Sequence, residues 1–310
     1  MSAQLKQSVL KSIFSLIRIP NLFILALVMY MVRLMLVEPL LILSHNAPAI
    51  SSLNFFIIVL STVMIAAGGY IINDIEDMDI DLLNERVNVF NIGSITKETG
   101  YNIYLILNFI AICLGFYLTL KCKVPYVAYA NLISAGLLYF YSTTYKRQFL
   151  IGNFIVSILT SFCLAIVYLT EHEASHIDSL KYLCTGYVVF AFLLSMAREL
   201  IKDIEDKPGD EKAGCKTFPI VVGITVSKIL VSIFILLILI LLIYIQIVSH
   251  QWESQIPFLY VAVFIEIPLL ILLVSLFISS NKDDYKRCSS IAKFIMLTGI
   301  LSMPVFFYTF

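Results

Sequence analysis

The sequence predicts an all-α integral membrane protein, with nine transmembrane helices around a central cavity that is capped by inner-side loops. Of the 310 residues, 60% are hydrophobic and only 14% are charged, and the mean hydropathy is +0.94. A water-soluble domain carries about 25% charged residues, so that class is excluded. The other two observations are continuous apolar runs long enough to cross a bilayer and basic residues that gather at alternate ends of those runs.

The apolar runs define the spans. A helix needs about 20 apolar residues to cross the hydrocarbon core of a bilayer, and nine runs approach or exceed this length. They are continuous rather than alternating, which excludes a transmembrane β-barrel. We expect them to form a single domain over residues 1–310. The runs cover about residues 14–37, 51–72, 101–120, 124–142, 150–170, 180–200, 225–248, 256–279 and 290–309.

The basic residues predict the orientation. With these nine spans, only Arg33, Lys121, Lys123 and Lys181 fall on one side, which leaves 17 of the 21 basic residues on the other. The positive-inside rule then places the N-terminus in the cytoplasm and the C-terminus outside. Because no organelle-targeting segment is visible, we expect the inner (cell) membrane of a bacterium. The neutral net charge indicates no nucleic-acid partner, and no segment indicates an obligate protein partner.

An acidic stripe follows the second span. Asp74, Asp77 and Asp81 stand at positions i, i+3 and i+7, so a helix continuing out of that span places them on one face, with Asn73 one turn from Asp77. Like charges arranged this way repel one another, and a bound cation relieves that repulsion. A solvated acidic loop is the alternative interpretation.

The same pattern returns 129 residues later, which favours a site. The segments 73–81 and 202–210 share D-x-x-D-x-x-x-D, and both directly follow an apolar span. The second copy supplies Asp203, Asp206 and Asp210. Pro208 and Gly209 predict that the helix unwinds before Asp210. We interpret the repeat as two carboxylate sets that face each other across a cavity.

Carboxylate oxygens without neighbouring His or Cys favour a hard cation. Mg²⁺ typically shares one or two carboxylates with a substrate phosphate, so two facing sets fit Mg²⁺ ions that bind a diphosphate. Basic side chains on the same side are candidates to hold the diphosphate oxygens, although each can also act as a positive-inside anchor. These candidates are Arg86, Lys146, Arg147, Arg198 and Lys202.

These motifs resemble those of the UbiA superfamily of intramembrane prenyltransferases. Its N-D-x-x-D-x-x-x-D motif is matched by Asn73 to Asp81, and its D-x-x-x-D motif by Asp206 and Asp210. The segment 198–220 looks like the branch that contains digeranylgeranylglyceryl phosphate synthases. Arg18 and Asn21 resemble the R-x-x-N of the family's first helix.

Two departures from the family pattern lie near the motifs. The prolines of the loop after the first motif are missing, and Asn88 stands where the family usually has a second arginine; Arg86 is a candidate substitute. Tyr141 stands five residues before Lys146, whereas the family's Y-x-x-x-K spacing is four. Tyr141 is nevertheless the residue that matches the tyrosine of this motif, and we take it as a candidate for contact with the acceptor.

The resemblance implies Mg²⁺-dependent transfer of a polyprenyl group from an allylic prenyl diphosphate to an acceptor in the membrane. We favour geranylgeranylglyceryl phosphate; a hydroxybenzoate, naphthoate or homogentisate type of aromatic acceptor, or haem, is the alternative. A cation transporter is a remote alternative, because a transporter has its carboxylates near the middle of the membrane and these lie at the ends of the spans. The six aspartates are expected to be catalytic, and Arg18, Asn21, Tyr141 and Glu199 to bind substrate. Glu199 and Lys202 are candidates for acceptor deprotonation or phosphate binding.

Overall fold

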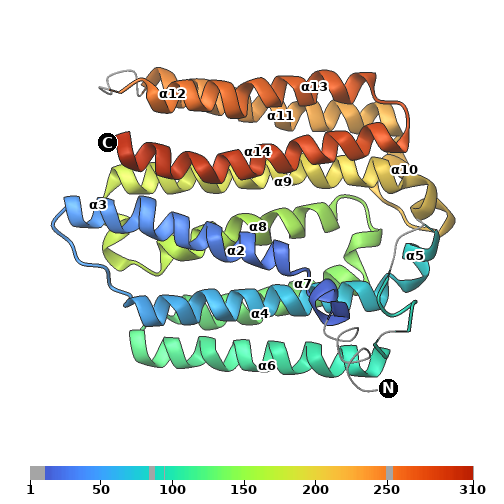
Figure 1. Ribbon diagram of the computed structural model, residues 1–310, viewed down its shortest axis with the longest axis horizontal. Helices are drawn as coiled ribbons and strands as arrows, with labels where there is room; N and C mark the ends of the chain where they lie inside the picture. The colour runs from blue at the N-terminus through green and yellow to red at the C-terminus, as the bar shows by residue number, and fades with distance from the viewer. Residues whose placement is uncertain (1–10, 84–87, 94, 249–253, 310) are drawn as a thin grey trace.

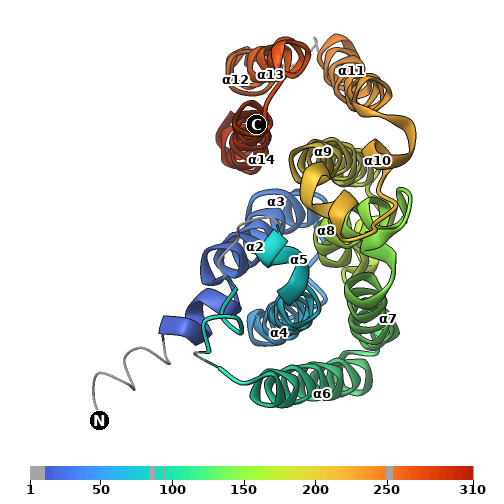
Figure 2. The ribbon, with the colours of Figure 1, turned by 90° about the vertical axis from the view of Figure 1, so that its right-hand side faces the viewer.

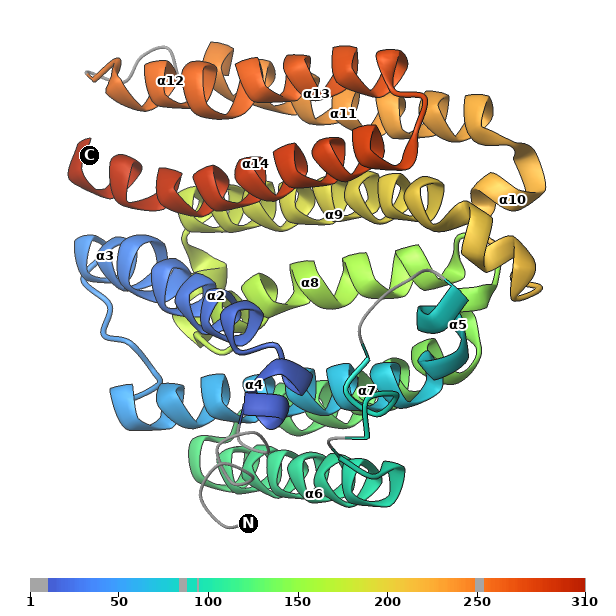
Figure 3. The same cartoon turned by 45° about the vertical axis from the view of Figure 1, so that its right-hand side comes forward.

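The computed structural model describes residues 11–83, 88–93, 95–248 and 254–309, and the regular structure within these ranges is helical. The long helices run roughly parallel to one axis and are stacked from α6 at one edge to α11–α13 at the other (Figure 1; Figure 3). In chain order the elements are α2 (Ile19–Met31), the π-helix η1 (Val32–Val37), α3 (Glu38–Leu43), α4 (Ser52–Glu76), α5 (Met78–Leu83), α6 (Lys97–Cys122), α7 (Pro125–Thr143), η2 (Tyr145–Arg147), α8 (Ile151–Leu169), η3 (His172–His176), α9 (Asp178–Lys212), α10 (Phe218–Val222), α11 (Ile224–Val248), α12 (Ile256–Val261), the π-helix η4 (Ala262–Glu266), α13 (Ile267–Ile278) and α14 (Lys282–Thr309).

Eight of the described helices are long and apolar enough to cross a membrane, and two of them are composite. The first joins α2, η1 and α3 into Ile19–Leu43, and the seventh joins α12, η4 and α13 into Ile256–Ile278. The expected count of nine is thus not confirmed. The remaining candidate is α7, a helix of 19 residues whose tyrosines and Asn131 lower its hydropathy; it packs against α4 and α6.

The elements that carry the two acidic motifs lie at one end of the bundle. The C-terminal ends of α4 and α9, together with α5 and α10, are at the right of Figure 1, and the C-terminal end of α14 is at the left. Viewed from that right-hand end, α5 lies between α4 and α9 (Figure 2), and it contacts α9. The fold therefore brings together segments that are about 130 residues apart, as the repeat predicts.

Two large apolar cores hold the bundle together. One core packs the first span and α4 against α7, α8 and the start of α9, with Met29, Val37 and Phe55 among its fully buried side chains. The other packs α9 against α11, α13 and α14. Helix α9 belongs to both cores: its start packs in the first and its later turns, up to Ile204, pack in the second.

Two local expectations about the acidic motifs need correction. The helix that carries the first motif does not continue unbroken: α4 ends at Glu76, Asp77 is its C-cap residue with φ −92° and ψ 0°, and α5 begins at Met78. Conversely, α9 does not unwind at Pro208 but continues to Lys212. A proline removes one helical hydrogen bond, and the ladder resumes beyond it, where the Ala213 amide donates to the Gly209 carbonyl at 3.0 Å.

Candidate active site

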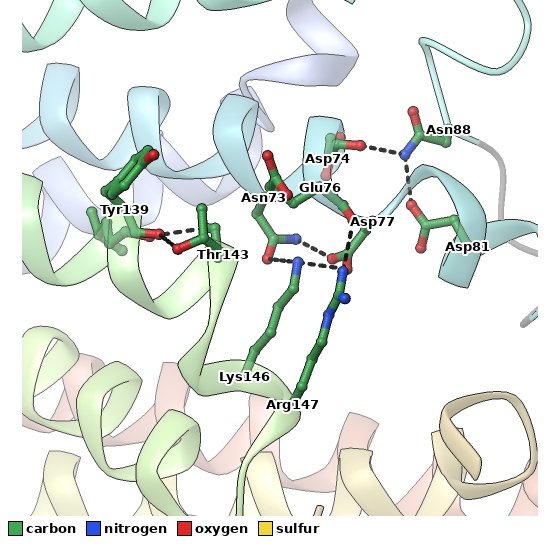
Figure 4. A network of polar contacts seen from close by, with 12 residues as sticks. Asn73, Asp74, Glu76, Asp77, Asp81, Asn88, Tyr139, Thr143, Lys146 and Arg147 are labelled. Atoms are coloured by element: carbon green, nitrogen blue, oxygen red, sulfur yellow. Dashed lines mark hydrogen bonds and ion pairs between the residues drawn. The ribbon is translucent and has the colours of Figure 1, made fainter. Parts of the chain in front are cut away.

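The first aspartate motif forms a polar network with the loop after α7 (Figure 4). Lys146 Nζ lies 2.6 Å from Asp77 Oδ1 and donates to Asn73 Oδ1 at 3.4 Å. Asn73 Nδ2 donates to the other Asp77 oxygen at 2.7 Å, so Asp77 is held on both sides. Arg147 donates to the Glu76 carbonyl at 3.3 Å. The two predicted basic residues of this loop therefore contact the motif directly.

Asp74 is paired with the start of the first span. Arg18 donates to Asp74 Oδ1 at 2.7 Å, and its guanidinium also lies 4.9 Å from the centre of the Tyr70 ring. The Asp74 side chain is 13% exposed, whereas that of Arg18 is 41% exposed. Arg18 thus links the interior of the site to its surface. Asn21, one turn further along the first span, has an exposed side chain.

Asn88 bridges Asp74 and Asp81 of the first motif by hydrogen bonds, a role that the sequence did not indicate. It is 2% exposed, and its Nδ2 donates to the Asp74 carbonyl and to Asp81 Oδ2, both at 2.7 Å. Its Oδ1 accepts from the Phe90 amide at 3.0 Å. Asn88 was singled out only as a departure from the family's arginine. The structure shows instead an amide that joins the two ends of the motif (Figure 4).

The second aspartate set lies on α9 at the same end of the bundle. Asp203 accepts a hydrogen bond from Asn153 of α8 at 2.7 Å. Asp206 is 6% exposed, and Asp210 is half-buried in the last turns of α9. Asn153 is a further site neighbour that no motif revealed, because a lone asparagine in an apolar span carries no spacing signal.

One turn earlier on α9, Arg198 and Glu199 form an ion pair of 2.7 Å. Glu199 is 8% exposed, and the buried Arg198 Nε has no hydrogen-bond partner. Lys202 is half-buried and interacts electrostatically with Asp203. The guanidinium and ammonium groups of this turn therefore border the second aspartate set.

Tyr141 of α7 lies where the two sets approach each other. Its hydroxyl is within electrostatic range of Asp77 in the first set, of Asp203 in the second, and of Glu199 and Arg18. Tyr141 therefore interacts with one aspartate of each set, Asp77 and Asp203. Arg86 lies outside the described residues.

Burial and charge act in opposite directions on Lys146. Burial lowers the pKa of the ammonium group, and the adjacent Asp77 carboxylate opposes this effect. The Lys146 side chain is 9% exposed. A charged amine in so buried a position depends on its anionic partner, which makes the ion pair with Asp77 the central interaction of the loop.

The donor set of the site suits a hard divalent cation. Its candidate ligands are carboxylate and amide oxygens, which are the ligands that hard cations prefer. Among the described residues, no three Asp, Glu, His or Cys side chains converge closely enough to hold an ion. Asp74, Asp77 and Asp203 are instead paired with Arg18, Lys146 and Asn153. The oxygen ligands of the site fit Mg²⁺. In the structure, the three aspartates are bound by cationic and amide groups of the chain itself.

Comparison with known families supports the motif assignment. The model of the UbiA prenyltransferase family matches residues 21–298. A digeranylgeranylglyceryl phosphate synthase of Methanothermobacter thermautotrophicus is 33% identical over 185 residues, which are 58% of this chain and 61% of that protein. The corresponding synthase of Korarchaeum cryptofilum is 27% identical over 242 residues, 77% of this chain and 81% of that protein. The alignments with the first relatives thus span about three fifths of their length.

Solved structures share the fold. A digeranylgeranylglyceryl phosphate synthase in membranes superposes with a TM-score of 0.69 at 23% identity, over 96% of this chain and 98% of that one. A UbiA homologue from Archaeoglobus fulgidus bound to GPP and Mg²⁺ has a TM-score of 0.58 at 16% identity, over 94% and 99% of the two chains. The relatives named here are archaeal, so the expected bacterial membrane and the orientation stay predictions.

Proposed function

Since this chain belongs to the UbiA prenyltransferase family, we propose that it transfers a polyprenyl group from an allylic prenyl diphosphate to a glyceryl phosphate lipid, with Mg²⁺ as cofactor. The observation that carries the proposal is that two aspartate sets lie at one end of the bundle, where α5 contacts α9 (Figure 1). One set comes from α4 and α5 and the other from α9, and basic side chains accompany both.

The aspartates would hold the metal. Asn73, Asp74, Asp77 and Asp81 are the proposed ligands on one side, and Asp206 and Asp210 on the other. Mg²⁺ bound there would neutralise the charge that develops on the leaving pyrophosphate. The diphosphate oxygens would be held by basic side chains of the same end of the bundle. These are Arg86, Lys146, Arg147, Arg198 and Lys202.

The reaction breaks the bond between C1 of the prenyl group and its diphosphate oxygen and forms a bond from C1 to the acceptor hydroxyl oxygen. The hydroxyl proton must pass to a base, and Glu199 is our candidate because it is buried beside Tyr141. Tyr141 would line the position of the allylic carbons, where its ring face stabilises positive charge. Arg18 and Asn21 would contact substrate at the edge of the site.

The acceptor class rests on the relatives. Several curated relatives are digeranylgeranylglyceryl phosphate synthases. This supports a glyceryl phosphate lipid rather than an aromatic acceptor of quinone biosynthesis, which is the second candidate. We place the aspartate end of the bundle in the cytoplasm, since most of the basic residues lie there.

A parallel assay separates the acceptor classes. Purified protein in detergent is given radiolabelled geranylgeranyl diphosphate and Mg²⁺, with geranylgeranylglyceryl phosphate in one tube and 4-hydroxybenzoate in another. Lipid product in the glyceryl phosphate tube alone is the expected result. Product in the aromatic tube alone would show that the acceptor is aromatic and not a glyceryl phosphate lipid. If folded protein releases no pyrophosphate in an EDTA-sensitive way, the enzyme assignment is refuted.

Alanine variants test the aspartates with a control from the same segment. Asp74→Ala, Asp77→Ala and Asp206→Ala are expected to abolish turnover while the protein remains folded. Asp79 is exposed, so Asp79→Ala is expected to keep most of the activity. Equal losses in all four variants would show that the position on the motif does not matter.

A further inference from the structure

The α7–α8 loop, residues 144–150, contacts both halves of the candidate site. On one side, Lys146 Nζ lies 2.6 Å from Asp77 Oδ1, and Arg147 donates to a backbone carbonyl of the same motif at 3.3 Å (Figure 4). On the other side, the Arg147 carbonyl accepts a hydrogen bond from the Lys216 amide at 2.8 Å. Lys216 lies just after α9, the helix that carries the second aspartate set. One loop therefore binds the segments of both sets.

A turn after α9 connects Lys216 to Asp210. The Cys215 amide donates to the Asp210 carbonyl at 2.9 Å, and Gly214 allows the turn by adopting a positive φ of 73°. Asp77 of the first set and Asp210 of the second are therefore joined through the α7–α8 loop and this turn. The contact of α5 with α9 is a second link between the two sets.

An aromatic pair fastens the loop on the α9 side. The ring centre of Phe149 lies 4.9 Å from that of Phe218 in α10, with an angle of 43° between the rings. Phe218 is buried in the apolar core of α9, α11, α13 and α14, and Leu150 packs against the same core. Such a ring pair adds to the stabilisation that burial alone provides. Because Phe218 is two residues after Lys216, the pair lies close in sequence to the hydrogen bond that Arg147 accepts.

The backbone of the loop is tightly constrained. Leu150 has φ 57° and ψ −19°, and a residue with a Cβ keeps a positive φ only where its surroundings hold it. Gly152, at the start of α8, is so close to η2 that an added Cβ would lie 2.8 Å from the Lys146 Cα and 3.0 Å from the Tyr145 carbonyl oxygen. A displacement of Phe149 is therefore transmitted to Lys146 rather than absorbed between them.

We propose that the α7–α8 loop positions the two aspartate sets relative to each other, with Phe149 as the positioning residue on the α9 side. The inference rests on the proposed function, in which a metal–diphosphate complex is held between the sets. A misplacement of about 1 Å can lower the rate of such a reaction by about 10²-fold. Phe149 acts through Arg147 and Lys216, and it needs no contact with the substrate.

Amide hydrogen exchange tests the link without turnover. The full chain in detergent is compared as wild type, Phe149→Ala, Phe149→Tyr and Phe154→Ala. Phe154 of α8 is a matched control, because its ring pairs with Phe192 of α9 at 5.6 Å and it is 50% exposed, against 42% for Phe149. Loss of a ring pair changes an equilibrium by up to about 10-fold. Exchange of the Lys216 amide should accelerate by about that factor in Phe149→Ala alone, and Phe149→Tyr should resemble wild type.

Kinetics separate a positioning role from a general loss of stability. In Phe149→Ala, kcat should fall about 10-fold while the KM for geranylgeranyl diphosphate changes less and Tm falls as in Phe154→Ala. Phe149→Tyr should restore kcat. Equal kcat in the two alanine variants, or a lower kcat without faster Lys216 exchange, overturns the inference and leaves the prenyltransferase function intact. If folded wild type shows no turnover and Phe149→Ala still accelerates Lys216 exchange, the function is refuted and the link between the two segments stands.

Discussion

Asn88→Ala is the substitution through which the geometry of the first aspartate motif can be tested most sharply. It removes the side chain that donates to the Asp74 carbonyl and to Asp81 Oδ2 at 2.7 Å and accepts from the Phe90 amide at 3.0 Å. The site is 2% exposed, so water does not replace these bonds easily. Asp81 and the 88–93 segment then lose their shared anchor.

The size of the effect follows from those three bonds. A hydrogen bond to a charged acceptor contributes about 1.5–3 kcal/mol, and a buried amide left unsatisfied costs about 1–3 kcal/mol. Neighbouring effects are not additive, so we expect a loss of about 3 kcal/mol in total. At roughly 2 °C for each kcal/mol in a chain of this length, Tm falls by about 6 °C.

The assay measures Tm in detergent and turnover at a temperature where the variant is fully folded. Because Asp81 loses its hydrogen bond from Asn88, we expect the apparent affinity for Mg²⁺ to fall more than the affinity for the acceptor. Asn91→Ala, which removes one hydrogen bond to the Met78 carbonyl at 2.8 Å from the same segment, is the control for loop stability. An Asn88→Ala protein with the Tm and Mg²⁺ dependence of Asn91→Ala would refute the argument.

Three further substitutions test other parts of the structure. Lys146→Gln should raise the KM for the diphosphate about 10-fold through loss of a cation, while relieving Asp77 of its ion pair; an unchanged KM would remove Lys146 from the diphosphate site. Gly152→Ala puts a Cβ 2.8 Å from the Lys146 Cα, so the loop that carries Lys146 must shift and turnover should fall several-fold. Wild-type turnover in Gly152→Ala would contradict this expectation. Arg33→Met leaves the buried Glu171 without its 4.0 Å ion pair and should lower stability by about 3 kcal/mol, measured as Tm, with activity intact.

The spans were predictable because bilayer crossing is a property of local composition. Runs of about 20 apolar residues gave the helices, and only α7 fell short, since tyrosines and Asn131 interrupt its hydropathy. Composite spans were not predictable. The π-helical turns at Val32–Val37 and Ala262–Glu266 change neither the length nor the apolar composition of their runs, so a count of apolar residues does not reveal them.

The candidate site residues that could be predicted are the aspartates, which repeat at a fixed spacing. The residues that could not be predicted are single asparagines that belong to no repeat. The repeat predicts that the two sets lie together, and the C-terminal ends of α4 and α9 do lie at one end of the bundle (Figure 1). Their shared role stays a prediction. Asn88 and Asn153 carry no such pattern; each acquires its role from a partner 7 or 50 residues away.

The pairing of aspartates with basic groups explains how the site can be both stable and ready for a charged substrate. Unpaired carboxylates at the end of a membrane bundle repel one another, and Arg18 and Lys146 remove that cost at Asp74 and Asp77. In the proposed function, a metal–diphosphate complex would bring both a cation for the carboxylates and an anion for the basic groups. Each ion pair would then exchange its partner without leaving a buried charge alone, which a site of carboxylates without cations would not allow.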